Sequence, residues 1–344
     1  MSPRNHGSGH LITRRAFLRT LGLTTGAALV TRQFLYAEHP AFEPFTFVQM
    51  SDAHVGKPKA AGTFRRAIES VEALRPRPEF LLITGDLAEK RRRNRRQFRD
   101  ILAGTRVPVH LVPGNHDVGN RISERSLALV GRYRETYGDD RYAFTVGEPG
   151  THALFLVLNS LWMRPWGTTS RKRRRKLTEH IDTQWQWFET QLDASRNGEH
   201  PATSVFVCLH HPPFTNRPQQ RLASYLTITM KAKRRLLALC VKHKVQAVLT
   251  GHVHRSHLHT YRGVQLINSP SVFWNTPRLG GGKVPLGYRV FHVRGDGIDY
   301  RYKTLDIRDL APYRVKTMKQ APGDGDFYAA LDGHAGNPRA LITV

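Results

Sequence analysis

Side chains that can bind metal ions occur in five short clusters along the middle of this 344-residue sequence. They are carboxylates, imidazoles and one amide: Asp52 and His54, Asp86, Asn115, His210, and His252 and His254. Oxygen and nitrogen ligands of this kind suit Mn, Fe, Zn or Co, whereas soft metals prefer sulfur. These ligands are too many for one tetrahedral ion but suit two ions that share a carboxylate. Two ions roughly 3.5–4 Å apart can hold the attacking and the departing oxygen of a phosphoryl group.

Each cluster follows a segment with the composition of a β-strand. These segments are residues 45–50, 80–84, 107–112, 205–209 and 245–250. Apolar residues at helical spacing predict helices over 63–74 and 94–102, so the first three strands alternate with helices, which is typical of a parallel sheet. In open α/β sheets, binding sites form beyond the carboxyl ends of the strands. We therefore expect the clusters to converge on one edge.

The rest of the chain adds helices and short strands around this alternating series. Helices are predicted over 122–137, 181–192 and 231–241, and strands over 141–146, 152–158, 257–261, 264–268, 288–293 and 298–302. This arrangement predicts two sheets packed face to face inside helices. The two cysteines, Cys208 and Cys240, are expected to be buried free thiols, with a single bridge between them as the alternative.

The clusters together resemble the motifs of a known family. The pattern Asp52-x-His54, Gly85-Asp86, Gly114-Asn115-His116-Asp117, His210 and Gly251-His252-x-His254 is similar, in content and order, to that of the calcineurin-like metallophosphoesterase superfamily. The resemblance implies an α/β fold, a four-layer αββα sandwich with two mixed β-sheets flanked by helices. It also implies that Asp52, His54 and His254 hold one metal ion, that Asn115, His210 and His252 hold the other, and that Asp86 bridges them.

The same resemblance implies an activity and two catalytic residues. His116 would protonate the leaving alkoxide or stabilise the phosphate charge, and Asp117 would orient its ring. The implied reaction is hydrolysis of phosphodiester or phosphomonoester bonds by a metal-bridging hydroxide. Diesters are favoured because the motifs look most like those of bacterial cyclic-nucleotide and glycerophosphodiester phosphodiesterases. Purple acid phosphatases differ, since they carry a tyrosine where this chain has Glu89. The alternative is an exported polyanion-binding protein whose metal site is structural.

The N-terminus has the features of an export signal. Residues 1–37 contain five arginines and no acidic residue, and Arg14-Arg15-Ala16-Phe17-Leu18 precedes an apolar run too short to span a bilayer. The paired arginines resemble the bacterial twin-arginine signal, which implies the twin-arginine export machinery as a partner and a periplasmic or extracellular product. An amphipathic helix or a lipid-associated anchor is the alternative. We expect a signal over 1–37, a catalytic domain over 38–310 and a partly disordered tail over 311–344.

The chain is strongly basic, with 53 Lys and Arg against 27 Asp and Glu and a formal net charge of +26. Two basic runs stand out, at 90–96 and at 171–176, and the second is expected in an insertion before a helix. Both follow predicted strand ends, so they could lie at the mouth of the site and attract a small phosphate-ester substrate. Solvated basic faces are the simpler alternative, and attachment to a polyanion or an anionic surface is the third. No obligate nucleic-acid partner is expected.

Overall fold

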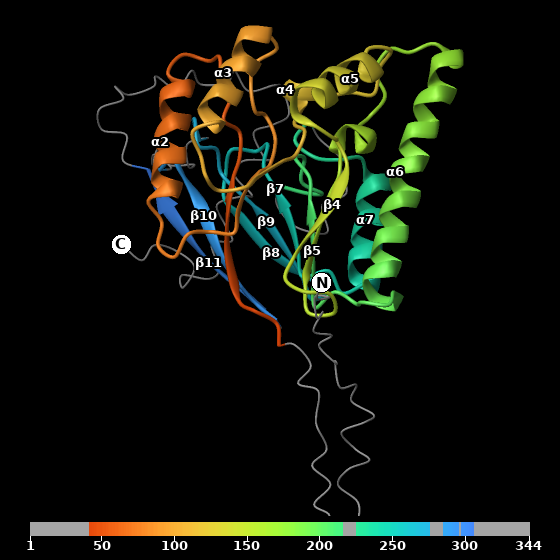
Figure 1. Ribbon diagram of the computed structural model, residues 1–344. Coiled ribbons are helices and arrows are strands. Elements are labelled where there is room, and N and C mark those ends of the chain that lie inside the picture. Colours follow the sequence, from red (N-terminus) through yellow and green to blue (C-terminus); the bar gives the residue numbers. More distant parts are fainter. Residues whose placement is uncertain (1–40, 216–224, 276–284, 296, 306–344) are drawn as a thin grey trace, which may run out of the picture. The chain divides into compact units, whose positions relative to one another are not determined.

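The computed structural model describes residues 41–215, 225–275, 285–295 and 297–305. The predicted export signal over 1–37 and the tail over 311–344 lie outside these ranges. From Phe45 onward, the described chain forms two β-sheets that pack against each other and are covered by helices on their outer faces (Figure 1).

The first sheet has five strands in the order β11-β10-β1-β2-β3. Their bounds are Phe45–Met50 for β1, Phe80–Ile83 for β2, Val109–Leu111 for β3, Gly287–Arg294 for β10 and Gly297–Thr304 for β11. The first three strands are parallel, as predicted, and β10 joins β1 in antiparallel pairing. Helices α2 (Ala60–Glu72) and α3 (Arg92–Leu102) connect the parallel strands and cover the outer face of this sheet (Figure 1).

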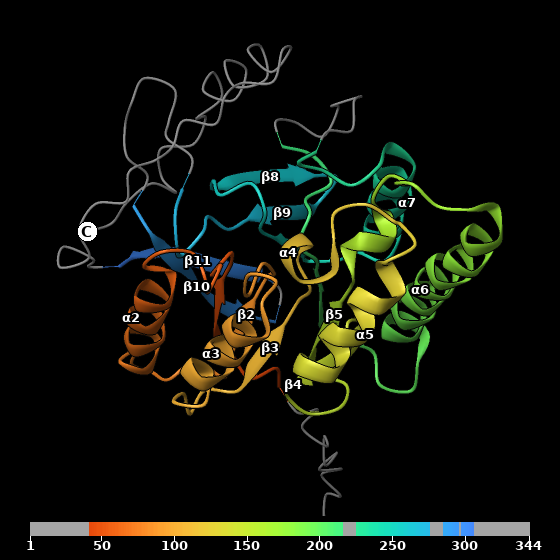
Figure 2. The same cartoon turned by 90° about the horizontal axis from the view of Figure 1, so that it is seen from above.

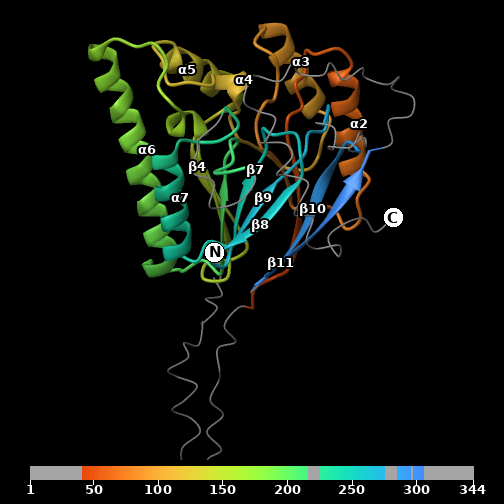
Figure 3. The ribbon, with the colours of Figure 1, turned by 180° about the vertical axis from the view of Figure 1, so that it is seen from behind.

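The second sheet has six strands in the order β4-β5-β6-β7-β9-β8. Their bounds are Tyr142–Val146 for β4, Ala153–Val157 for β5, Ser204–Cys208 for β6, Ala247–Thr250 for β7, His257–Tyr261 for β8 and Val264–Asn268 for β9. The four inner strands are parallel, and β4 and β8 are antiparallel edges. Helices α6 (Arg171–Asn197) and α7 (Met230–Lys242) cover this sheet, as Figure 3 shows from behind.

The helices differ most from their predicted bounds. α6 begins at Arg171 rather than at residue 181, so the expectation of an insertion at 171–176 is wrong. The Ser170 hydroxyl caps the helix by accepting a hydrogen bond from the Arg173 amide, and the Arg174 guanidinium lies 4.6 Å from the centre of the Trp166 ring. α5 spans Ser126–Tyr137, close to its prediction, whereas the short α4 (Asn115–Val118) and the 3₁₀ turn at Ser160–Met163 were not predicted.

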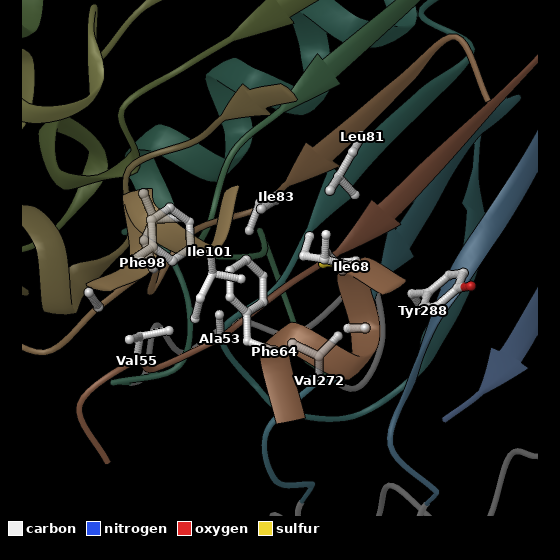
Figure 4. Close-up of a cluster of buried hydrophobic side chains, with 14 of the residues drawn as sticks. Ala53, Val55, Phe64, Ile68, Leu81, Ile83, Phe98, Ile101, Val272 and Tyr288 are labelled. Atoms are coloured by element: carbon white, nitrogen blue, oxygen red, sulfur yellow. The ribbon is translucent and has the colours of Figure 1, made fainter. Parts of the chain in front are cut away.

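Three apolar layers hold the sandwich together. Between the sheets, the Phe47 ring stacks on Phe80 and Phe291 at centroid distances of 4.9 and 4.6 Å. Under α2 and α3, Phe64 stacks on Phe98 at 4.9 Å (Figure 4). A third cluster lies between the second sheet and α6 and α7. Apolar layers lie on both faces of each sheet, so inner strands such as β2 and β5 are continuously apolar, and the expected four-layer architecture is confirmed.

Two smaller expectations concern the cysteines and membrane spans. Cys208 and Cys240 are both free and buried, as expected. Within the described ranges, none of the helices has both the length and the apolar character needed to cross a bilayer.

Candidate metal centre and active site

The carboxyl ends of five strands meet at one edge of the sandwich. Figure 2 looks onto this edge, with α4 near its centre. Backbone hydrogen bonds join the loops there: the Asp52 amide donates to the Gly85 carbonyl at 3.0 Å, and the Gly251 amide donates to the His210 carbonyl at 3.0 Å. The buried Gln49 side chain connects the two sheets by donating to the Thr250 carbonyl at 3.1 Å. The loops that carry the predicted ligands therefore converge, as expected.

Five of the predicted ligands adopt a left-handed backbone conformation. They are Asp52, His54, Asp86, His252 and His254, with φ values between 46° and 71°. This conformation costs a non-glycine residue on the order of 1–3 kcal/mol and is concentrated at functional sites. The loops also pack closely, because a methyl group on Gly251 would collide with the Ser51 hydroxyl. The surrounding fold thus holds the ligands in a conformation that they would not otherwise prefer.

Asp52, His54 and His254 form the first ligand group. Nε2 of His54 lies 3.2 Å from Nε2 of His254, and Oδ1 of Asp52 lies 3.1 Å from the same His254 nitrogen. All three side chains are buried, and Asp52 Oδ1 has no hydrogen-bond partner among the described residues. The other side of the His254 ring is fixed, since Nδ1 lies 2.7 Å from the Trp274 carbonyl. A cation would satisfy the orphaned carboxylate oxygen and both imidazole nitrogens.

Asp86, Asn115, His210 and His252 form the second group. Nε2 of His210 lies 3.1 Å from Asn115 Oδ1 and 3.4 Å from Asp86 Oδ1. Nδ1 of His210 lies 2.7 Å from the Thr84 carbonyl, an acceptor that favours a proton on Nδ1 and leaves Nε2 to bind a metal. The ligand atoms of Asp86, His210 and His252 all lie within 4.8 Å of one another. This group can therefore hold a second ion.

Asp86 lies between the two groups. Its Oδ1 faces His210 at 3.4 Å, and its Oδ2 faces Nε2 of His54 at 3.6 Å. One oxygen is thus directed to each group, which is the arrangement that a bridging carboxylate requires.

Burial and neighbouring charges set the ionisation of these side chains. Burial would raise the pKa of Asp86, but the positive charge of His210 outweighs it and holds the pKa well below its usual range. Burial also lowers the pKa of His54 and, to about 3, that of His252. The pKa of His210 is the exception, since the effect of Asp86 exceeds that of burial and raises it to about 9. Metals bind ionised carboxylates and neutral imidazoles, so an ion beside His210 would displace a proton.

His116 lies beside both ligand groups. Its ring is 4.6 Å from the ring of His54 and nearly perpendicular to it, and its amide donates to Asp86 Oδ1 at 2.8 Å. Burial would lower the pKa of His116, but Glu89 and Asp86 outweigh that effect and raise the pKa. A ring with a raised pKa next to the ligands suits the predicted role of proton donor.

Glu89 is a candidate functional residue that the sequence reasoning missed. Its Oε1 lies 3.1 Å from Nδ1 of His116 and 3.3 Å from Nδ1 of His54, so it links the proton donor to a ligand. Asp117, which was expected to orient the His116 ring, instead accepts hydrogen bonds from the Gly114 amide at 2.9 Å and the Leu87 amide at 3.2 Å. Its position three residues after Asp86 was the feature of the sequence that could have pointed to Glu89 as a residue of the site.

A cavity of about 420 Å³ opens beside Asn115 and His116. The first basic run contributes Lys90 and Arg95 to its lining, and α5 with the residue before it contributes Arg125, Leu129, Arg132, Tyr133 and Tyr137. Part of the run at 90–96 therefore lies at the mouth of the site, whereas no residue of 171–176 lines this cavity.

Comparison with known proteins shows that this chain is similar to phosphoesterases. The family model for calcineurin-like phosphoesterases matches residues 45–256, which include all five motifs. The serine/threonine-protein phosphatase CPPED1 of Rattus norvegicus is 28% identical over 287 residues, covering 76% of this chain and 85% of the rat protein. The glycerophosphodiester phosphodiesterase GpdQ of Enterobacter lignolyticus is 27% identical over 212 residues, covering 61% and 68%. A solved dimetal phosphatase from Danio rerio shares the fold, with a TM-score of 0.53 at 19% identity, covering 76% and 97%.

Proposed function

Because this chain belongs to the calcineurin-like phosphoesterase family, and is therefore a metal-dependent phosphoric ester hydrolase, we propose that it works with two metal ions and favours phosphodiesters. The position of Asp86, whose two oxygens face different ligand groups, carries the two-ion proposal. The similarity to GpdQ supports cleavage of diesters, while the similarity to a protein phosphatase supports monoesters as the second candidate.

The donor set fits two divalent ions such as Mn, Fe, Zn or Co. Asp52, His54 and His254 would hold one ion, Asn115, His210 and His252 the other, and both would share Asp86. When bound, the ions supply an activated water nucleophile and positive charge for the phosphoryl group. The buried and unpartnered Oδ1 of Asp52 is the observation that favours a cation over a purely hydrogen-bonded cluster.

His116 and Glu89 supply the protein's own contribution to bond breaking. Hydrolysis cleaves the bond between phosphorus and an ester oxygen, places the oxygen of water on phosphorus, and leaves an alkoxide that needs a proton. His116 would donate that proton, with the Glu89 carboxylate 3.1 Å from Nδ1 favouring the protonated form of the ring. No covalent bond between enzyme and phosphate is needed.

Chelated protein is expected to hydrolyse bis(p-nitrophenyl) phosphate only after a divalent metal such as Mn is restored. Metal analysis of the active protein should give two ions per chain, and the diester should be cleaved faster than p-nitrophenyl phosphate. A metal-loaded protein that cleaves neither compound would contradict the proposal and favour the polyanion-binding alternative with a structural metal site. Full activity with one ion per chain would contradict the two-ion part alone.

We also propose that the chain is exported by the twin-arginine route. The support is the sequence of residues 1–37, which lie outside the described residues. Replacing both Arg14 and Arg15 with lysine should retain the full chain in the cytoplasm of a bacterial host, as measured by cell fractionation. The matched control is Arg4→Lys with Arg32→Lys, which should be exported normally. Unchanged export of the Arg14 and Arg15 variant would refute the route.

A further inference from the structure

The cavity beside His116 has a lining that metal chemistry alone does not explain. It shares Asn115 and His116 with the ligand region, so it is continuous with the place where the scissile phosphate would bind. At about 420 Å³ it falls in the size range of small-molecule sites. The part of a substrate that lies beyond its scissile phosphate can therefore occupy this cavity.

Four cations from two parts of the chain line this cavity. Lys90 and Arg95 come from the loop after β2 and from α3, Arg125 directly precedes α5, and Arg132 lies in the middle of that helix. The spacing of seven residues between the two arginines places them on one face of the helix. Among the described residues, no carboxylate lies within ion-pair distance of any of the four. The cavity is thus a concentrated and unneutralised positive site.

The acidic residue in the lining does not neutralise this charge. Asp117 is the one carboxylate among the lining residues, and its oxygens accept hydrogen bonds from the Gly114, Leu87 and Ala88 amides. It is therefore engaged with the backbone under α4. The four cations remain available to an anion that enters from the site.

Two tyrosines add unused hydrogen-bond donors. Tyr133 is 2% exposed, and the hydroxyls of Tyr133 and Tyr137 have no hydrogen-bond partner among the described residues although both side chains line the cavity. A buried hydroxyl without a partner is unfavourable, so such groups call for an explanation. Anionic oxygens of a ligand would accept hydrogen bonds from both.

We infer that this cavity is a second phosphate subsite, and that the natural substrate is a small organic molecule with a second phosphate besides the one that is cleaved. This inference rests on the proposed function, because it assigns the cleaved phosphate to the metal ligands and His116. The second phosphate would lie among Lys90, Arg95, Arg125 and Arg132, with the tyrosine hydroxyls as additional donors. Because this group takes no part in bond breaking, its contacts should lower KM more than they raise kcat.

The test compares the binding of two non-hydrolysable probes to the metal-loaded full chain. Propane-1,3-diyl bisphosphonate should bind at least about tenfold more tightly than propylphosphonate, since a contact with a charged group is worth about that much or more. Isothermal titration calorimetry gives both constants without any need for turnover. Metal content measured before and after titration excludes extraction of the ions by the bisphosphonate.

The decisive variant is Arg125→Gln with Arg132→Gln. It should remove most of the preference for the bisphosphonate while leaving the affinity for propylphosphonate within about twofold. The matched control is Arg92→Gln with Arg93→Gln, which removes the same charge from exposed positions of α3 outside the cavity lining and should keep the preference. Equal binding of the two probes by the unmodified protein, or a preference that the Arg125 and Arg132 variant retains, would overturn the subsite.

The outcome for this subsite is separable from that of the proposed function. Turnover of bis(p-nitrophenyl) phosphate reports the metal centre alone, because this compound has a single phosphate. Turnover without a preference for the bisphosphonate would overturn the subsite and leave the proposed function standing. Preference without turnover would support the subsite and contradict the proposed function.

Discussion

Replacing Asp86 with asparagine is expected to reduce the metal content below two ions per chain and to lower kcat on the order of 10³-fold or more, because both ligand groups lose a shared charge. Oδ1 of Asp86 faces His210 and Oδ2 faces His54, so a neutral amide weakens both groups at once. Asparagine can still accept the hydrogen bond from the His116 amide, which keeps α4 in place. Metal analysis and steady-state kinetics are the measurements.

The control for Asp86 is an aspartate without a role at the site. Asp100→Asn on the exposed face of α3 removes the same charge and should keep full metal content and rate. A melting temperature close to that of the unmodified protein would show that the Asp86→Asn variant is folded. Full occupancy by two ions in Asp86→Asn would contradict the bridging assignment.

The His116→Ala variant is expected to keep both metal ions and to lose rate in proportion to how poor the leaving group is. Loss of a general acid costs about 10²–10⁴-fold where the alkoxide needs a proton and much less where the leaving group is stable as an anion. Alkyl esters should therefore be affected strongly and p-nitrophenyl esters weakly. A series of esters with leaving groups of graded pKa measures this as a slope, and an equal loss for all of them would rule out the acid role.

Two carboxylate variants identify which residue positions the His116 ring. Glu89→Gln should reproduce the leaving-group dependence of His116→Ala at a smaller size, because Oε1 of Glu89 faces Nδ1 of that ring at 3.1 Å. Asp117→Asn should mainly lower the melting temperature, because its oxygens hold backbone amides of Gly114 and Leu87. If Asp117→Asn showed the leaving-group dependence and Glu89→Gln lowered only the melting temperature, Asp117 would be the orienting residue.

The sequence predicts the ligand-bearing edge well because each cluster directly follows an apolar strand. The strand over 45–50 was predicted with its observed bounds, and the β2 and β7 predictions differ from the structure by at most two residues at either end. Parallel pairing then forces their carboxyl ends to one side. This logic needs only the local pattern and the direction of the chain, both of which the sequence contains.

The remaining features depend on contacts between segments that are distant in the sequence. Glu89 lies in the loop after β2, and only the fold brings His54 and His116 beside it. The early start of α6 was missed because a run of like charges lacks apolar periodicity, whereas the fold places Trp166, which lies outside the helix, beside Arg174. The cavity lining was not predicted for the same reason, since Arg125 and the residues of α5 that line it belong to none of the ligand clusters.

The left-handed backbone of five ligand residues carries a conformational free-energy cost, which can be met either during folding or during metal binding. These residues are bent by the packing of the loops and by hydrogen bonds such as that from the Asp52 amide to the Gly85 carbonyl, so folding rather than metal binding bears the conformational cost. Ion binding then requires little further ordering of the chain, which favours high affinity. The folded chain would accordingly keep whichever suitable ion it binds first, and its catalytic rate would reflect the metals present when it folded.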